Sequence, residues 1–378
     1  MRRVGLLAQW RQTAGFTQDK LAEALGVDRS TVHRWEAGSN SPRPWQVPLL
    51  AELINRTPIE VQEALERQSG ASEPVINPSG VVDLPPGELR MVLLDLERRY
   101  DRVPSSSLLA DASQYFARLD RLGRQLRGGK EQQAVLALQA EAATLLGKLV
   151  WDASQRRDHA GARRYYSQAA ALARRVRDPE LESHAFLRSS YIDLYGTRDA
   201  TTGLALAEAA VRRAVPVSPA LASLALLHVG EAHAMLGDRT ACERSIGLAQ
   251  DQLGRIDTGS VNGLVSPDQV GRLAGSCYLE LGQLRRAQDE LETVAGILGH
   301  SRKSRAIVLG NLALAFIRQQ QIDGALAVLD QAVDELEQTR GGGGMNLVFA
   351  AARELRPWRQ EVPVLDLQDR LLSLMAAP

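Results

Sequence analysis

The sequence predicts an all-α protein in two parts, a small N-terminal helical domain followed by a longer array of helical repeats. Alanine, leucine, glutamine, glutamate and arginine are abundant and aromatic residues make up only 4% of the chain, a composition that favours helices. From residue 88 onward, amphipathic segments of roughly 15 to 20 residues follow one another almost without strand signals. A chain of 378 residues is also too long for one ordinary core, so two or three units are expected.

Charge and cysteine content exclude several classes of protein. The formal net charge is zero, so any contact with nucleic acid must come from a local basic face. Lysine is scarce beside arginine, a bias that indicates a GC-rich bacterial genome. The two cysteines, Cys242 and Cys277, show no metal-ligand spacing, and we expect reduced, buried thiols rather than a disulfide framework. No apolar run of about 18 residues and no secretory signal stand out, which predicts a cytoplasmic protein without a membrane contact.

Composition shifts predict the domain boundaries. Residues 1–67 contain short helical patterns broken by glycines and prolines, which indicates a compact domain. Residues 68–87 read QSGASEPVINPSGVVDLPPG, rich in proline, glycine and serine, and are predicted to be a linker. Residues 88–340 are predicted to form helical repeats, and residues 341–378 to form helices that cap the array or pair with a second subunit.

The helical segments fit a tetratricopeptide-like template, in which small residues recur where two antiparallel helices must approach closely. The best copy places Gly230 and Cys242 at small positions and Leu226 and Ile246 at large ones. Five irregular units are expected, longer than the usual 34-residue period, and a generic helical bundle is the alternative. The run Gly341–Gly344 is expected to break the helix and end the fifth repeat. The small anchors of the five units are Ala162, Gly203, Cys242, Ala287 and Ala325.

Within the first domain, two short helices joined by a glycine turn form a helix-turn-helix pattern. Thr17 is a typical N-cap and Gly26 a typical left-handed C-terminal residue. In the second helix, Val32 and Trp35 are expected to point inward, which leaves a polar face outward. The second helix of such a motif places its first residues in the DNA major groove.

The stretch GFTQDKLAEALGVDRSTVHRWEAGSNSPRP resembles the DNA-binding domain of Cro and phage repressors, over roughly residues 3 to 67. The resemblance implies base reading by Arg29, Ser30 and Arg34, which suits guanine recognition. It also implies a structural pair between Arg11 and Glu36. Asp28 departs from a basic reading face, and we expect it to cap the helix or accept a hydrogen bond from cytosine. The predicted contacts to double-stranded operator DNA are Gln18, Arg29, Ser30, His33, Arg34, Ser39, Asn40 and Arg43.

The same resemblance extends to regulators that join a repressor-type domain to tetratricopeptide repeats, such as the peptide-pheromone receptors of Gram-positive bacteria and their actinobacterial relatives. In such arrays, the first helices of the repeats line a concave groove that binds a ligand. The side chains at those positions would suit a peptide or a small acidic effector. The predicted ligand-binding residues are Lys148, Trp151, Arg188, Tyr195, His228, Glu231, Arg272 and Asn311.

The sequence contains no phosphate-binding loop, dinucleotide fingerprint, zinc-protease or nucleophile-elbow motif, and its histidines show no metal-ligand pairing. We therefore predict no catalytic residues, no bound metal and no cofactor. The predicted function is a ligand-responsive transcription regulator of the quorum-sensing type, acting as a homodimer on paired half-sites. The alternative is an adaptor whose repeats dock a partner protein, with DNA binding secondary.

Overall fold

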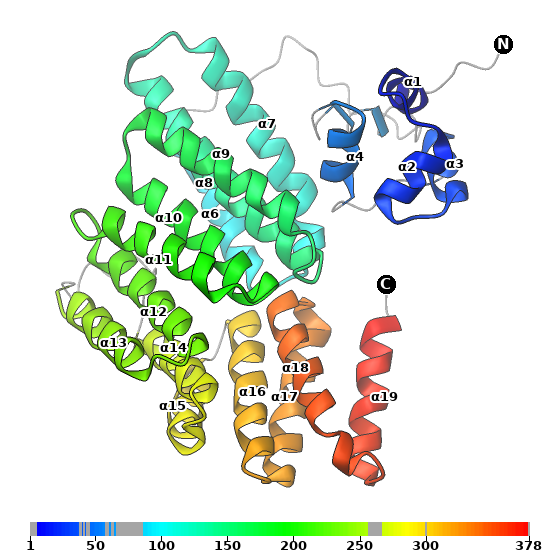
Figure 1. Ribbon diagram of the computed structural model, residues 1–378. Helices are drawn as coiled ribbons and strands as arrows, with labels where there is room; N and C mark the ends of the chain where they lie inside the picture. Colours follow the sequence, from blue (N-terminus) through cyan, green and yellow to red (C-terminus); the bar gives the residue numbers. More distant parts are fainter. Residues whose placement is uncertain are drawn as a thin grey trace.

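A computed structural model describes residues 6–37, 40, 42, 46–56, 60–61, 64–65, 86–255, 267–298 and 301–376. Every element assigned in these ranges is helical, which confirms the predicted all-α class, and Figure 1 shows a small N-terminal group of helices beside a curved array of longer ones. The predicted linker lies almost wholly outside the described residues.

In the part of the N-terminal group that the structure describes, four short helices with assigned bounds share one core. Leu7 of α1, Leu21 of α2, Val32 and Trp35 of α3, and Leu50 of α4 are all buried in this core. Their spacing along each helix is the amphipathic spacing expected of a small helical domain. The helices are α1 (Leu6–Thr13), α2 (Gln18–Leu25), α3 (Arg29–Glu36) and α4 (Val47–Leu53).

Long antiparallel helices build the rest of the chain. After α6 (Pro86–Tyr100), a 3-10 turn at Ser105–Ser107 and α7 (Leu109–Gln125), five consecutive helix pairs follow in the described part of the chain. This solenoid of pairs agrees with the five predicted units. The pairs are α8 (Gly129–Ala153) with α9 (His159–Val176), α10 (Pro179–Tyr191) with α11 (Ala200–Ala214), α12 (Pro219–Met235) with α13 (Arg239–Leu253), α14 (Pro267–Glu280) with α15 (Leu284–Ile297), and α16 (Arg302–Arg318) with α17 (Ile322–Thr339).

Small residues stand where paired helices cross. All five predicted anchors are buried in the second helix of their pair. A Cβ at Gly203 would lie 2.5 Å from the side chain of Leu194, and one at Gly275 would lie 2.7 Å from Leu291. Real Cβ atoms do not pack this closely, so a larger side chain at either glycine would force the helices apart.

The fifth repeat ends at Thr339, just before the glycine run, as predicted. The run itself does not stay non-helical, which corrects the prediction, because Gly342–Glu354 forms helix α18 and three of the four glycines make its first turn. This turn packs against the end of α8, nearly two hundred residues earlier. A Cβ at Gly342 would lie 3.0 Å from the carbonyl oxygen of Asp152, and one at Gly344 would lie 2.7 Å from the Cβ of Ala306. Tertiary contact therefore outweighs the low helix propensity of glycine here. A 3-10 turn at Arg356–Trp358 and α19 (Val362–Ala376) complete the chain.

The array closes on itself through three buried polar contacts. Lys303 Nζ of α16 lies 2.8 Å from Asp152 Oδ2 and donates a second hydrogen bond of 2.8 Å to Ser105 Oγ. The backbone N–H of Gly342 donates to Asp152 Oδ1 at 2.7 Å, which caps the N-terminus of α18. Asp152 therefore joins the first helix pair to both the last pair and α18, and we call these residues the clasp.

Helix α8 qualifies on length and apolar composition as a possible membrane span, although the sequence reading found no such run. In the structure, 78% of that stretch is buried among other helices. A buried core helix accounts for the same composition.

Candidate functional site

Local capping produces the helix-turn-helix. The Thr17 hydroxyl accepts a hydrogen bond of 3.1 Å from the Lys20 backbone N–H and so starts α2. Gly26 has a φ of 64° and ends that helix in the left-handed conformation, as predicted. Val32 and Trp35 then fix α3 against the core and leave its opposite face exposed.

The exposed face of α3 carries Arg29, Ser30, His33 and Arg34, as predicted. The Arg34 guanidinium lies over its own helix, donating to the Ser30 carbonyl at 3.2 Å and to Thr31 Oγ1 at 3.3 Å. Arg29 forms only a long, exposed ion pair of 3.6 Å with an aspartate of α2. Such an exposed pair contributes little, so the Arg29 guanidinium can turn toward DNA at small cost.

Two buried side chains hold α1 against α3. Arg11 Nε lies 2.5 Å from Glu36 Oε1, and the Arg11 guanidinium also donates to the Phe16 carbonyl at 2.6 Å. Both side chains of the pair are 8% exposed, which confirms the predicted structural pair. Gln18 Nε2 donates to Glu36 Oε2 at 2.6 Å, so this amide stabilises the α2–α3 packing in the free protein.

The structure places the remaining residues predicted at the DNA interface in different situations. Asp28 occupies the N-cap position of α3, but its side chain makes no capping bond, so acceptance of a hydrogen bond from cytosine is the predicted role that remains. Asn40 is exposed just beyond α3. Ser39 and Arg43 lie outside the described residues. DNA contact by Gln18, whose amide bonds to Glu36, stays a prediction.

In the repeat array, three of the predicted ligand-binding residues meet directly. His228 Nδ1 lies 2.7 Å from Glu231 Oε2, one turn along α12, and the Tyr195 hydroxyl donates to the same carboxylate. Tyr195 sits in a π-helical turn, Ile192–Thr197, that ends α10 and turns the ring toward α12. Such turns often mark functional sites.

Cations gather around the same residues, and we use the name groove for this set of predicted ligand-binding residues together with Arg156 and Tyr100. Lys148 Nζ lies 3.4 Å above the centroid of the Tyr100 ring, and the Arg188 guanidinium lies 5.1 Å from that of Tyr191. The Arg156 guanidinium lies 4.8 Å from the Trp151 ring and 5.6 Å from the Tyr195 ring. Aromatic faces attract cations but do not neutralise them.

None of four groove cations forms an ion pair with a carboxylate in the described part of the chain. By contrast, the nearby Lys303 is paired with Asp152 in the clasp. A charge removed from water without a partner is costly, so the groove favours an anion. The four cations are Lys148, Arg156, Arg188 and Arg272.

Two buried ring nitrogens also have no hydrogen-bond partner among the residues that the structure describes. They are Nε1 of Trp151 and Nε2 of His228. The bond from His228 Nδ1 to Glu231 places the proton of a neutral imidazole on Nδ1, so its Nε2 is an acceptor. The indole Nε1 is a donor, so the two nitrogens offer one donor and one acceptor.

Burial shifts the pKa values of the groove residues. It lowers the pKa of Lys148 to about 7, assisted by the positive charge of Arg188. It lowers the pKa of His184 to about 3, for the same two reasons. It also lowers the pKa of His228, although the hydrogen bond with Glu231 opposes the shift. Lys148 is therefore the groove cation whose charge changes near neutral pH.

The structure brings together most of the predicted ligand-binding residues. The charge of Arg272 on α14 contributes to the pKa shifts of His228 and Glu231, so it acts on them electrostatically without a hydrogen bond or ion pair to either. Asn311 is buried on α16 and makes no hydrogen bond with the other seven. The sequence did not predict Tyr100 and Arg156 as groove residues. Arg156 stands in a turn with φ of 60°, outside the repeat template, and a lone aromatic at the end of α6 gives no signal.

Comparison with known proteins supports the reading of the first domain. A family model described as a helix-turn-helix domain matches residues 4–64, so this part of the chain is a helix-turn-helix domain. The match supports the interpretation of the protein as a DNA-binding regulator. No curated protein matches the chain. Among solved structures, BtubC (BKLC) from P. vanneervenii is similar with a TM-score of 0.43 and 17% identity, over 64% of this chain and 90% of that one.

Proposed function

We propose that this protein is a sequence-specific transcription regulator whose repeat groove senses an anionic peptide or small molecule. For the DNA half, support comes from the exposed polar face of α3 in a helix-turn-helix domain. For the sensing half, one observation carries the proposal: among the described residues, four groove cations have no carboxylate partner and two buried ring nitrogens have no hydrogen-bond partner. The regulator acts in the cytoplasm, as a homodimer on paired half-sites.

A chain of contacts connects the groove with the DNA-binding domain. Asp193, in the turn that carries Tyr195, accepts two hydrogen bonds of 3.1 and 2.6 Å from Arg163 of α9. The next residue, Arg164, forms an ion pair of 3.1 Å with Glu52 of α4. The last pair is exposed and weak, so a ligand that shifts Tyr195 can alter it at small cost. A coupling of about 1 to 3 kcal/mol between the sites is typical of such regulators.

Replacing the guanidinium groups of α3 tests the DNA half. We expect Arg29→Ala and Arg34→Ala each to cost about 1 to 3 kcal/mol at a selected site and to relax base preference there, since each removes a bidentate base contact. Sites are selected from a random duplex library, and affinity is measured by fluorescence anisotropy at fixed salt. Arg353→Ala, an exposed change on α18, is the matched control. Unchanged affinity and selectivity in both α3 variants would refute the assignment.

The pKa of Lys148 allows a test of the sensing half. Inorganic phosphate should stabilise the full chain below pH 7 and progressively less above it, because the lysine loses its charge as the pH rises through about 7. Lys148→Met should weaken this effect and flatten its dependence on pH. The readout is the thermal midpoint with and without phosphate.

The same lysine also affects stability without ligand. Its folded pKa lies below its unfolded value, so the unfolded chain binds more protons between about 7 and the usual lysine pKa, and stability should rise with pH across that window. Lys148→Met should remove this rise.

For the phosphate experiment, equal stabilisation by phosphate of the wild type and of Lys148→Met at every pH would exclude the groove as the anion site and favour partner docking.

A further inference from the structure

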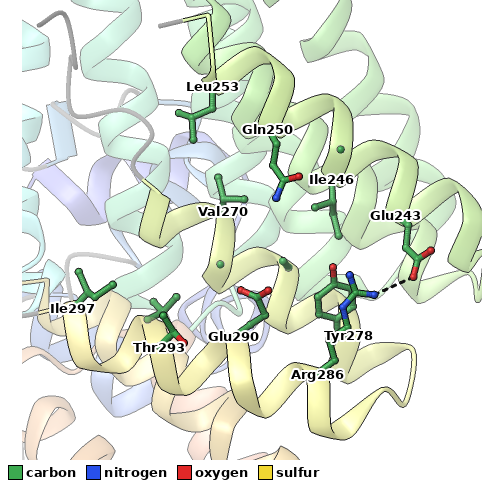
Figure 2. A pocket seen from close by; sticks show the side chains of 14 residues that line it. Glu243, Ile246, Gln250, Leu253, Val270, Tyr278, Arg286, Glu290, Thr293 and Ile297 are labelled. Atoms are coloured by element: carbon green, nitrogen blue, oxygen red, sulfur yellow. Dashed lines mark hydrogen bonds and ion pairs between the residues drawn. The ribbon is translucent and has the colours of Figure 1, made fainter. Parts of the chain in front are cut away.

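A cleft of about 560 Å³ lies between α13, α14 and α15, where the third and fourth helix pairs of the array meet (Figure 2). Helix α13 lines one side and α15 the other, with residues of α14 between them. Glu243 and Arg286 stand at one end of the cleft, and Leu253 and Ile297 at the other. Its volume falls within the roughly 300 to 1,000 Å³ that is usual for small-molecule sites. None of its lining residues belongs to the groove around Lys148, so the cleft is a separate space in the array.

The walls of the cleft are largely apolar away from its charged end. The apolar lining includes Ile246 and Leu253 of α13, Val270 of α14, and Val294 and Ile297 of α15. Ile297 is 65% exposed, so hydrocarbon is left in contact with water at this end. A ligand with an apolar body would remove that surface from water, which favours binding.

A glycine in the middle of α13 keeps the cleft open. A Cβ at Gly247 would meet no atom of the described residues within 4 Å, so no packing contact there requires glycine. By contrast, a Cβ at Gly271 would lie 2.7 Å from the side chain of Val294, so the close packing of α14 on α15 explains that glycine. Glycine inside a helix lowers stability, because it loses more conformational freedom on folding than other residues. Gly247 therefore leaves unfilled a space that a side chain could occupy without a clash.

The cleft carries one unpaired negative charge in the described part of the chain. Its charged lining residues are Glu243, Arg286 and Glu290. Glu243 forms an ion pair of 3.2 Å with Arg286, whose guanidinium also lies 3.9 Å from the centroid of the Tyr278 ring. The half-buried Glu290 carboxylate points into the cleft (Figure 2) and forms neither an ion pair nor a hydrogen bond with a described residue. A carboxylate beside apolar walls is stabilised by a cation, so the charge of the cleft favours a ligand with one positive charge.

We propose that the cleft binds an amphiphilic amine, a small molecule with one ammonium group and an apolar body. The ammonium group donates to the Glu290 carboxylate, and the apolar body packs against Ile246, Val270 and Ile297. This site does not rest on the anion proposed for the groove, because different residues line the two sites and their charges are opposite.

Calorimetric titration of the full-length protein with octylamine at pH 7 tests the proposal, with 1-octanol as the uncharged probe of equal chain length. We expect octylamine to bind at one site per chain and roughly tenfold more tightly than 1-octanol, the contribution of one hydrogen bond to a charged group. Glu290→Gln should abolish this preference. Glu292→Gln, an exposed change on the same helix outside the cleft, is the matched control and should keep it. Equal affinity of the two probes for the wild type, or an unchanged preference in Glu290→Gln, would overturn the proposal.

Two glycine substitutions test whether the probe lies in the cleft. Gly247→Leu places a side chain in the cleft and should abolish octylamine binding. Gly296→Leu on α15 is the matched control, because a Cβ there also meets no described atom within 4 Å but Gly296 does not line the cleft. Neither variant should have a lower thermal midpoint than the wild type, since leucine replaces glycine inside a helix without a clash.

Two outcomes of the glycine experiment would contradict the site. Binding of octylamine by Gly247→Leu with the affinity of the wild type would place the probe elsewhere on the protein. Absence of octylamine binding by the wild type, together with a dimer that Gly247→Leu alone dissociates in analytical ultracentrifugation, would show that a second copy of the chain covers the cleft instead.

Discussion

Asp152→Ala is expected to destabilise the repeat array by about 3 to 5 kcal/mol, because it leaves the Lys303 ammonium buried without its counter-ion. The same change removes the acceptor for the Gly342 N–H at the start of α18. An array of this kind has a total stability of only about 5 to 15 kcal/mol, so the variant should lose much of its margin. The measurement is urea unfolding of the full chain followed by far-ultraviolet circular dichroism.

A double-mutant cycle separates the ion pair from the cap. Lys303→Met removes the buried charge, so Asp152→Asn should cost less in a Lys303→Met background than in the wild type. The asparagine also keeps an oxygen for the Gly342 N–H. Hydrogen exchange should rise in α8, α16 and α18 of Asp152→Ala, because these helices meet at the clasp. If the losses of unfolding free energy from Asp152→Asn and Lys303→Met simply added in the double variant, the clasp would not hold the ends of the array together.

The sequence predicted the helix-turn-helix well because its determinants are local. Thr17, Gly26 and the apolar positions of α2 and α3 act within a few residues of one another, and short-range rules describe such contacts. The small anchors of the repeats could be predicted from the sequence for a similar reason. Each anchor meets the partner helix of its own pair, within about one repeat length.

The closure of the array was not predictable in the same way. Lys303 and Gly342 meet Asp152 only because the curvature of five helix pairs adds up to bring the ends together. No local pattern encodes that sum, and the glycine run therefore read as a helix break. The groove was recovered in part, since repeat positions predict which side chains face inward. Tyr100 was missed because it lies on α6, before the repeats, and Arg156 because it lies in the turn between α8 and α9, outside the template positions.

Arg11→Ala is expected to unfold much of the helix-turn-helix domain while the repeats stay folded. The change leaves the Glu36 carboxylate buried with only the amide of Gln18 as a polar partner, and it removes the bond to the Phe16 carbonyl. Breaking a buried pair in this way costs about 3 to 5 kcal/mol, close to the whole stability of a small domain. Hydrogen exchange should increase across α1 to α4 of the full chain, and DNA affinity should fall for every sequence alike.

The uniform loss of DNA affinity separates Arg11→Ala from the variants on the exposed face of α3. Arg29→Ala and Arg34→Ala change which bases are preferred in a folded domain, whereas Arg11→Ala reduces the fraction of chains able to bind any DNA. A combined Arg11→Met and Glu36→Met variant should recover part of the lost stability, because apolar side chains of similar length can replace a buried ion pair at little net cost. If Arg11→Ala left the exchange of α1 to α4 unchanged, the pair would not be holding α1 against α3, and the fold of the domain would rest on the Leu7 and Trp35 core alone.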